Sequence, residues 1–182
     1  MREIRSANCS ADLDAIHRLD IEAFGDRAYS FDKMKAIYDA CSDYTTLLIE
    51  SGELLGYVYL YSLKPSDFAK FRGGSMPERD MDTFTRAELK AAPAMLWYIS
   101  DIVVRPDKQK TGVGMAVFRA AIRKWLTLPI AYPARLYAIA YSDGGARLMK
   151  NFGFSKVAVG KDMADGDDLY ELAIDAPPRF TM

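Results

Sequence analysis

The stretch that most constrains this chain is RPDKQKTGVGMAVFRAAIRKW, from Arg105 to Trp125. A proline ends an apolar run, two lysines follow, and two glycines stand one residue apart before an amphipathic pattern begins. A helix that opens in this way presents unpaired backbone N–H groups and a partial positive charge at its start. Such helix starts bind anions, often phosphate groups. The segment therefore predicts a strand, a loop and a helix, with an anion site where the helix begins.

The spacing of apolar residues predicts the other elements of the chain. Strands are expected over 2–7, 44–51, 53–63, 94–104 and 134–142, with a final hairpin over 154–175 around an acidic turn at 162–168. Helices are expected over 10–25, 30–41, 112–128 and 143–153. Ser10 is the expected N-cap of the first helix and Gly25 its stop, and Ser51-Gly52 indicates a hairpin turn. At 182 residues the chain can bury a core as one domain over 1–182.

The segment 64–92 interrupts this pattern. It shows little strand periodicity and contains Gly73-Gly74, Pro77 and mixed charge, with a short helix expected at 85–92. Connections this long inside compact domains tend to be lids or binding loops. We expect an insertion between strands here, either a lid or a tolerated surface loop.

Composition argues against several classes of function. Lys+Arg number 24 against Asp+Glu 25, so no global positive field favours nucleic acid as a partner. Cys9 and Cys41 lie far apart and His17 is the one histidine, which argues against a metal site and fits a reducing compartment. With no long apolar run and no export signal, we expect a cytoplasmic monomer or homodimer without a membrane partner.

Two familiar glycine-rich motifs do not fit the loop. A P-loop needs Lys and then Ser or Thr after its last glycine, but Gly114 is followed by Met115-Ala116. A dinucleotide fingerprint needs Gly or Ala three residues after the second glycine, where Val117 stands.

A third pattern fits. Val104-Arg105-Pro106 and then Gln109 to Gly114 resemble the acyl-CoA signature of the GNAT N-acetyltransferase superfamily, Gln/Arg-x-x-Gly-x-Gly/Ala after a strand and a proline. The later stretch SDGGARLMKNFGF resembles that family's second motif, an Ala/Gly-x-x-Leu helix ending in Gly-Phe. The element order is similar to the GNAT fold over nearly the whole chain. The resemblance implies an α/β (α+β) fold with a central mixed, mostly antiparallel, twisted sheet of about six to seven strands and about four helices.

The resemblance also implies acetyl-CoA as co-substrate. By resemblance the cofactor-binding residues are Ile102, Val103, Val104, Gln109, Lys110, Thr111, Gly112, Val113, Gly114 and Ser142. The loop would hold the pyrophosphate, since glycines remove Cβ atoms that would keep it away from the N–H groups, and Val113 can point into the core. Lys108 and Lys110 add positive charge, although a solvated loop is the alternative for the lysines alone. The strand end 102–104 would pair with the pantetheine arm.

The expected reaction is attack by a neutral amine on a thioester, so a group must accept the amine proton, directly or through water. The catalytic candidates are Tyr98, Ser100 and Asp101. In this superfamily a glutamate near Tyr98 or Ser100 often serves as base, and neither position is acidic here. Asp101 is a carboxylate, but alternation points it away from the face of Ser100 unless a bulge intervenes. Asp101 is therefore either the base or a structural, hydrogen-bonded acid.

The position of the family's tyrosine acid, four residues before the glycine of Gly-Phe, is occupied by Met149. A thiol with a pKa near about 8.5 leaves passably without a proton donor. Tyr141 is either a substitute acid or a buried aromatic. The sequence thus favours an acetyl-CoA-dependent N-acetyltransferase acting by direct attack on a primary amine of a small molecule or a protein or peptide. The alternative is a catalytically weak or inactive GNAT-fold CoA-binding module, and the acceptor stays open.

Overall fold

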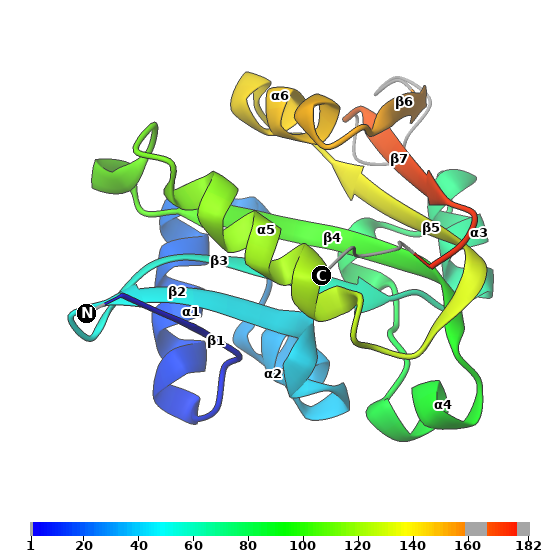
Figure 1. The fold of residues 1–182 in the computed structure, drawn as a ribbon, viewed down its shortest axis with the longest axis horizontal. Coiled ribbons are helices and arrows are strands. Elements are labelled where there is room, and N and C mark those ends of the chain that lie inside the picture. Colours follow the sequence, from blue (N-terminus) through cyan, green and yellow to red (C-terminus); the bar gives the residue numbers. More distant parts are fainter. Residues whose placement is uncertain (1, 159–166, 178–182) are drawn as a thin grey trace. The chain divides into compact units, whose positions relative to one another are not determined.

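The computed structural model describes residues 2–158 and 167–177, and within them the elements follow in chain order as labelled in Figure 1. They are β1 (Arg2–Arg5), α1 (Ser10–Phe24), α2 (Phe31–Ala40), β2 (Thr45–Glu50), β3 (Glu53–Ser62), α3 (Pro65–Arg72), α4 (Arg86–Ala91), β4 (Ala94–Val104), α5 (Val113–Trp125), β5 (Ile130–Ile139), α6 (Asp143–Asn151), β6 (Ser155–Ala158) and β7 (Leu169–Ile174). The strands are ordered β1-β2-β3-β4-β5-β7-β6. β4 and β5 are parallel, and β1–β2, β2–β3, β5–β7 and β6–β7 are antiparallel. The predicted mixed, mostly antiparallel α/β fold is confirmed.

Most predicted elements are present with ends close to those expected. The N-cap of α1 is Cys9 rather than Ser10, because Cys9 has the extended backbone and Ser10 is already helical. β5 begins at Ile130, earlier than expected, since Ile130 pairs with Ala94 of β4. α5 ends at Trp125, before the expected stop, because the residues after it form a tighter turn. Part of the expected acidic turn, 162–166, lies outside the described residues.

The predicted hairpin turn between β2 and β3 is confirmed by its backbone angles. Ser51 has a φ of 54° and Gly52 a φ of 85°. Two successive left-handed residues form the turn that best matches the twist of paired strands. The turn fixes the register in which Glu50 pairs with Glu53.

The chain divides into two compact units, each made of two segments of sequence. Within the described residues the first unit comprises 2–61 with 100–128, and the second comprises 62–99 with 129–158 and 167–177. β4 passes from the second unit to the first at Ser100. The single domain expected over 1–182 stays a prediction.

In the first unit, helices cover both faces of the strands. Figure 1 shows α1 and α2 on one face of β2 and β3 and α5 on the other. α5 contributes the large buried side chains Phe118 and Trp125, while Ile16 of α1 and Met34 of α2 are fully buried. The 3.6-residue spacing of apolar positions in each helix explains why one face of each is buried.

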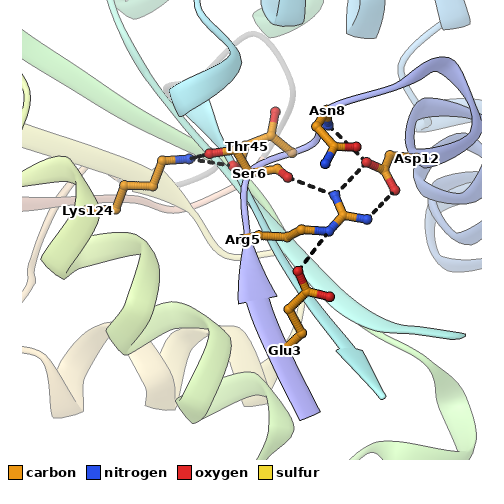
Figure 2. Close-up of polar contacts among 7 residues, drawn as sticks. All are labelled: Glu3, Arg5, Ser6, Asn8, Asp12, Thr45 and Lys124. Atoms are coloured by element: carbon orange, nitrogen blue, oxygen red, sulfur yellow. Dashed lines mark hydrogen bonds and ion pairs between the residues drawn. The ribbon is translucent and has the colours of Figure 1, made fainter. Parts of the chain in front are cut away.

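Polar contacts fix the connection between β1 and α1 (Figure 2). The Arg5 guanidinium donates two hydrogen bonds to the carboxylate of Asp12, at 2.6 and 2.8 Å, and the Asn8 N–H donates to the same carboxylate at 2.9 Å. The hydrogen bond from Arg5 lowers the pKa of Asp12. Lys124 of α5 donates to the Ser6 hydroxyl, and also to the carbonyl oxygen of Thr45 at 2.8 Å. The start of α1 is therefore held by charge-assisted hydrogen bonds.

In the second unit, the segment 64–92 forms two helices and packs as part of the core. The helix expected at 85–92 is present as α4, where Thr85 and Glu88 form a capping box. The helix α3 was not expected, although its sequence places Pro65 in the first turn, where proline is tolerated. The Phe68 ring of α3 lies 4.3 Å from the ring of Tyr137 on β5. The segment therefore has a fixed packed conformation in this structure, and its role as a lid or a surface insertion stays a prediction.

Candidate functional site

The helix that follows the glycine loop begins without a side-chain cap. Gly112 is the N-cap of α5, and the first turn of the helix contains no acidic residue. The N–H groups of that turn therefore keep the unpaired donors and partial positive charge that a helix start carries. This helix start can bind an anion.

The two glycines of the loop meet different needs. Gly112 has a φ of +87° and a Cβ there would meet no atom within 4 Å, so the left-handed backbone is the reason for glycine. At Gly114 a Cβ would come 3.3 Å from Cγ2 of Val104, so the missing side chain lets α5 begin close to the end of β4. Val113 between them is 2% exposed and anchors the loop in the core.

Arg105 fixes the shape of the loop. Its Nε donates to Oδ1 of Asp107 at 2.6 Å, and its Nη1 donates to Oε2 of Glu53 at 2.7 Å. These bonds join the loop to the first residue of β3 and lower the pKa of Asp107 through the hydrogen bond from Arg105. This role could not be predicted from the sequence, because Glu53 lies 52 residues away from Arg105 and no local pattern indicates the pair.

The polar side chains of the loop differ in how far they are already engaged in hydrogen bonds or ion pairs within the protein. Lys108 Nζ lies 3.6 Å from Oδ2 of Asp107, so its charge is partly offset. The Thr111 hydroxyl donates to the carbonyl oxygen of Lys108 at 2.6 Å, and the Gln109 amide contacts the carbonyl of Val104 at 3.4 Å. Lys110 is exposed, has a φ of 62°, and forms no ion pair within the described residues. Lys110 is therefore the cation of the loop best placed to meet an anion.

The end of β4 approaches β3 closely on one side. The Arg105 N–H donates to the carbonyl oxygen of Leu55 at 2.9 Å. A Cβ on Gly56 would lie 2.6 Å from the carbonyl oxygen of Val103, a distance that real side chains do not reach. Gly56 is therefore required for this approach. An isolated glycine inside a strand pattern was the sequence signal that could have indicated it.

Toward β5, the part of β4 that belongs to the second unit is paired in parallel. Within the described residues, the register between β4 and β5 runs from Ala94 to Ile99. Ile102 and Val104 are partly exposed, whereas Val103 is buried.

The three catalytic candidates on β4 are all buried. Tyr98 is 0% exposed, Ser100 4% and Asp101 7%. The Ser100 hydroxyl donates to Oδ2 of Asp101 at 2.8 Å, so these two side chains are brought together. The Tyr98 ring packs against the ring of Phe71 at 6.3 Å, which is the packing of a core aromatic.

One extra residue in β4 bears on the direction of Asp101. The Leu63 N–H donates to the carbonyl of Leu96, and the Arg105 N–H donates to the carbonyl of Leu55. β3 advances 8 residues between these bonds, from 55 to 63, while β4 advances 9, from 96 to 105. A strand with one residue in excess of its partner contains a β-bulge, which interrupts the alternation of side chains. Simple alternation of side chains along β4 therefore does not determine the face of the sheet to which Asp101 points.

A second buried carboxylate, Asp20 on α1, was not identified from the sequence. Asp20 is 1% exposed, and its Oδ2 accepts a hydrogen bond from the Tyr29 N–H at 2.9 Å. Its Oδ1 accepts a hydrogen bond from the hydroxyl of Tyr57 on β3. Burial raises the pKa of Asp20, against the opposing effect of these hydrogen bonds. The signal was its spacing, since Asp20 stands four residues after Ile16 on the apolar face of the helix.

Tyr57, the partner of Asp20, is buried beside Tyr59 on the same strand. Their ring centroids lie 5.5 Å apart, and both side chains are fully buried. Burial raises the pKa of each phenol, and the negative charges of Asp101 and then Asp20 raise it further. Both phenols are therefore neutral near pH 7.

In the second unit, the predicted residues around α6 have local partners. The Ser142 hydroxyl accepts a hydrogen bond from the Gly145 N–H at 3.1 Å and so caps α6. Met149 is 2% exposed. The Tyr141 hydroxyl donates to Oε2 of Glu78 at 2.6 Å, and Glu78 is itself 7% exposed. Tyr141 is therefore tied to the segment 64–92.

Two further findings concern the described residues as a whole. They contain no group of three or more His, Cys, Asp or Glu side chains able to hold a metal ion. No helix in these ranges is both long and apolar enough to cross a membrane.

Comparison with solved structures identifies the fold of this chain. The sequence matches no protein-family model and no curated protein. Among solved structures, the GNAT-like decarboxylase GphF in complex with isobutyryl-CoA aligns with a TM-score of 0.70 at 14% identity, covering 94% of this chain and 99% of that chain. The loading GNATL domain of CurA from Lyngbya majuscula aligns with a TM-score of 0.69 at 10% identity, covering 96% and 98%. The ribosomal-protein-S18-alanine N-acetyltransferase from Escherichia coli aligns with a TM-score of 0.61 at 16% identity, covering 97% and 96%. The chain has the GNAT fold.

Proposed function

We propose that this chain is an acetyl-CoA-dependent N-acetyltransferase that moves an acetyl group to a primary amine of a small molecule or of a protein or peptide. The observation that carries the proposal is the uncapped start of α5, where Gly112 and Gly114 leave the first-turn N–H groups open to an anion. Solved structures of the same fold include one in complex with isobutyryl-CoA and one bound to CoA and a peptide.

The pyrophosphate is assigned to the start of α5. Gln109 to Gly114 surround the open N–H groups, and Lys110 supplies a charge that no carboxylate offsets within the described residues. Two phosphates at a helix start gain from both the donors and the partial positive charge. Ser142 is proposed as a CoA contact by the family resemblance, and its hydroxyl hydrogen is not used in capping α6.

The pantetheine arm is assigned to the backbone of 102–104. In this assignment the backbone groups of the strand end pair with an extended amide-bearing chain as they would with a strand. Gly56 and Arg105 hold the opposite side of the strand end, which keeps this backbone in place before a ligand arrives.

The proton of the amine is assigned to Asp101, directly or through a water. The amine nitrogen forms a bond to the thioester carbonyl carbon, the carbon–sulfur bond breaks, and the ammonium proton passes to the carboxylate. Ser100, which donates to Asp101, would orient that carboxylate. Met149 has no proton to give, so the thiolate leaves unprotonated and is protonated by solvent. Tyr98 is proposed to shape the site by packing.

A second function is a catalytically weak or inactive CoA-binding module. The burial of Asp101 and the methionine at the family's acid position favour it. The acyl group is also open, since the solved structures of this fold include one described as a GNAT-like decarboxylase. For either function we propose a cytoplasmic monomer or homodimer, on the basis of two distant cysteines and a net charge of −1.

A matched pair of glycine variants tests the ligand assignment. Gly112 and Gly52 have φ of +87° and +85°, and neither would bring a Cβ within 4 Å of another atom. Alanine at either position should therefore cost a similar stability, about 1–2 kcal/mol. Gly112→Ala should weaken acetyl-CoA binding at least tenfold in calorimetric titration, and Gly52→Ala should leave it unchanged. Equal affinities in both variants would remove the assignment of the loop.

Turnover separates the two functions. Thiol release from acetyl-CoA is measured with a panel of primary amines, including a polyamine, a lysine peptide and a peptide with a free N-terminus. Release that requires an amine supports the transferase. Tight acetyl-CoA binding without release on any amine would support the binding module.

A further inference from the structure

A pocket in the first unit lies between the first half of α1 and the strands β1, β2 and β3. Its volume is about 630 Å³, and small-molecule sites usually measure roughly 300–1,000 Å³. All the residues that line it lie within 2–54, so none belongs to the glycine loop at 109–114. The proposed transferase reaction makes no use of this pocket.

The strands supply an apolar wall. In the sheet register Ile49 of β2 is opposite Leu54 of β3, and Leu47 of β2 is opposite Arg5 of β1. Side chains directly opposite one another in paired strands point to the same face of the sheet. This is the face turned toward α1, since Arg5 donates to Asp12 on that helix (Figure 2). Leu47, Ile49 and Leu54 all line the pocket.

One side of α1 forms the facing wall. Ala11, Ala15 and Arg18 line the pocket and follow one another at intervals of four and three residues, which places them on one side of the helix. The two alanines carry only a methyl group each, so the space between helix and strands is not filled from this side. The guanidinium of Arg18 adds a positive charge to the same row.

Arg18 is also the charged lining residue that forms no ion pair within residues 2–158 and 167–177. The other four charged lining residues are paired: Arg2 with Glu50 at 3.0 Å, and Arg5 with Glu3 at 3.4 Å and with Asp12 at 2.6 Å. The pocket therefore combines apolar walls with one uncompensated positive charge. A guanidinium binds a carboxylate through two parallel hydrogen bonds. A phosphate dianion would bring a second negative charge toward Glu3 and Asp12, so a monoanion fits the pocket better.

We propose that this pocket binds a monocarboxylate with an apolar body, of the kind of a medium-chain aliphatic acid. The carboxylate accepts hydrogen bonds from Arg18, and the hydrocarbon lies against Leu47, Ile49 and Leu54. The inference is independent of the proposed function, because it involves neither the glycine loop nor Asp101.

Calorimetric titration with butanoate, hexanoate and octanoate tests the apolar part. Affinity should rise about threefold to fourfold for each methylene group that is buried. Ala15→Leu fills the space between helix and strands, and should weaken octanoate binding at least about tenfold. An affinity that does not depend on chain length would overturn the proposal.

Octanamide, which has the same hydrocarbon and no charge, tests the role of Arg18. Because Arg18 is exposed, water screens its charge, and octanamide should bind about fivefold more weakly than octanoate. In Arg18→Gln the two ligands should bind equally. Arg123→Gln is the matched control, since Arg123 is an exposed arginine on α5, which covers the opposite face of the strands (Figure 1). This variant should keep the wild-type preference for octanoate.

Amide NMR shifts of labelled protein locate the bound acid. Shifts that centre on 11–18 and 47–54 and persist with saturating acetyl-CoA would support the proposal. Displacement of octanoate by acetyl-CoA, with unchanged affinity in Arg18→Gln, would assign the acid to the start of α5 and overturn it. So would equal binding of octanoate and octanamide by wild type, or no binding of octanoate at millimolar concentration. Arg18→Gln and octanamide decide the matter even where Ala15→Leu does not fold.

Discussion

Gly56→Ala tests how closely β3 must approach the end of β4. The added methyl carbon would lie 2.6 Å from the carbonyl oxygen of Val103, whereas ordinary contacts begin at 3.4 Å. The neighbour is backbone, so no side-chain rotation relieves the clash. The two strands must separate by several tenths of an ångström. The hydrogen bond from the Arg105 N–H to Leu55, one residue away on β3, is the first that would lengthen.

Two costs set the size of the effect on stability. Overpacking costs about 1–3 kcal/mol, and a weakened backbone hydrogen bond costs about 1 kcal/mol. The sum, about 2–4 kcal/mol, is a large part of the roughly 5–15 kcal/mol that stabilises a typical domain. For a chain of this size it corresponds to a fall in Tm of roughly 5–15 °C. Since Val103 and Arg105 belong to the proposed ligand site, acetyl-CoA affinity should fall as well.

Thermal unfolding by circular dichroism, with and without acetyl-CoA, measures both effects. Gly144→Ala on α6 is the control, because its Cβ would meet nothing closer than 3.7 Å and alanine favours helix. The control should unfold at or slightly above the wild-type Tm. A Gly56→Ala protein that unfolds within 1 °C of wild type, on the order of the scatter in Tm, would show that the strand end adapts freely and that the close approach is not required.

Three further substitutions test the loop and α6. Lys110→Ala should reduce acetyl-CoA affinity and its salt dependence more than Lys108→Ala, since Lys108 is already ion-paired, and titration at low and high salt measures this. Met149→Ala should raise KM for acetyl-CoA more than it lowers kcat, because methionine cannot donate a proton; a thousandfold fall in kcat at unchanged KM (on the scale of a lost general acid) would contradict it. Tyr141→Phe should cost about 1–2 kcal/mol of stability by removing a donor to the buried Glu78, with kcat changed less than about tenfold. A larger fall in kcat with the fold intact would identify Tyr141 as a proton donor.

The elements of the fold could be predicted because each follows from local patterns. The apolar run of β4 predicted where this strand begins and ends, and Gly25 predicted where α1 ends. The helix α3 was missed because eight residues with two phenylalanines carry a weak helical pattern. Its stability comes from packing, as the contact between Phe68 and Tyr137 shows, and packing cannot be read from a single segment.

The candidate site could be predicted only where it is continuous in sequence. The loop from Gln109 to Gly114 is one segment, so its glycines and their place at a helix start were visible. The ion pair of Arg105 with Glu53 joins residues 52 apart, and the contact of Asp20 with Tyr57 joins residues 37 apart. Such contacts depend on strand register and on the position of a helix over a sheet, and a one-residue bulge in β4 is enough to change which side chains meet.

The buried carboxylate of Asp20 should make the protein less stable as the pH rises, and this can be measured without a substrate. Burial raises the folded-state pKa of Asp20 above its ordinary value of 3.8, so the folded state binds the proton more tightly than the unfolded state. The stabilisation from that proton is complete below the unfolded-state pKa and is lost as the pH rises through the folded-state pKa. Asp20→Asn carries no such charge, so its free energy of unfolding, measured with urea, should rise relative to wild type as the pH rises above the unfolded-state pKa of about 4. Asp12→Asn is the matched control on the same helix, because the hydrogen bond from Arg5 lowers the pKa of Asp12 and wild type should lose stability relative to this variant as the pH falls. Parallel curves for wild type and Asp20→Asn would show that the hydrogen bonds from Tyr57 and Tyr29 offset the effect of burial, and the predicted rise of the Asp20 pKa would be wrong.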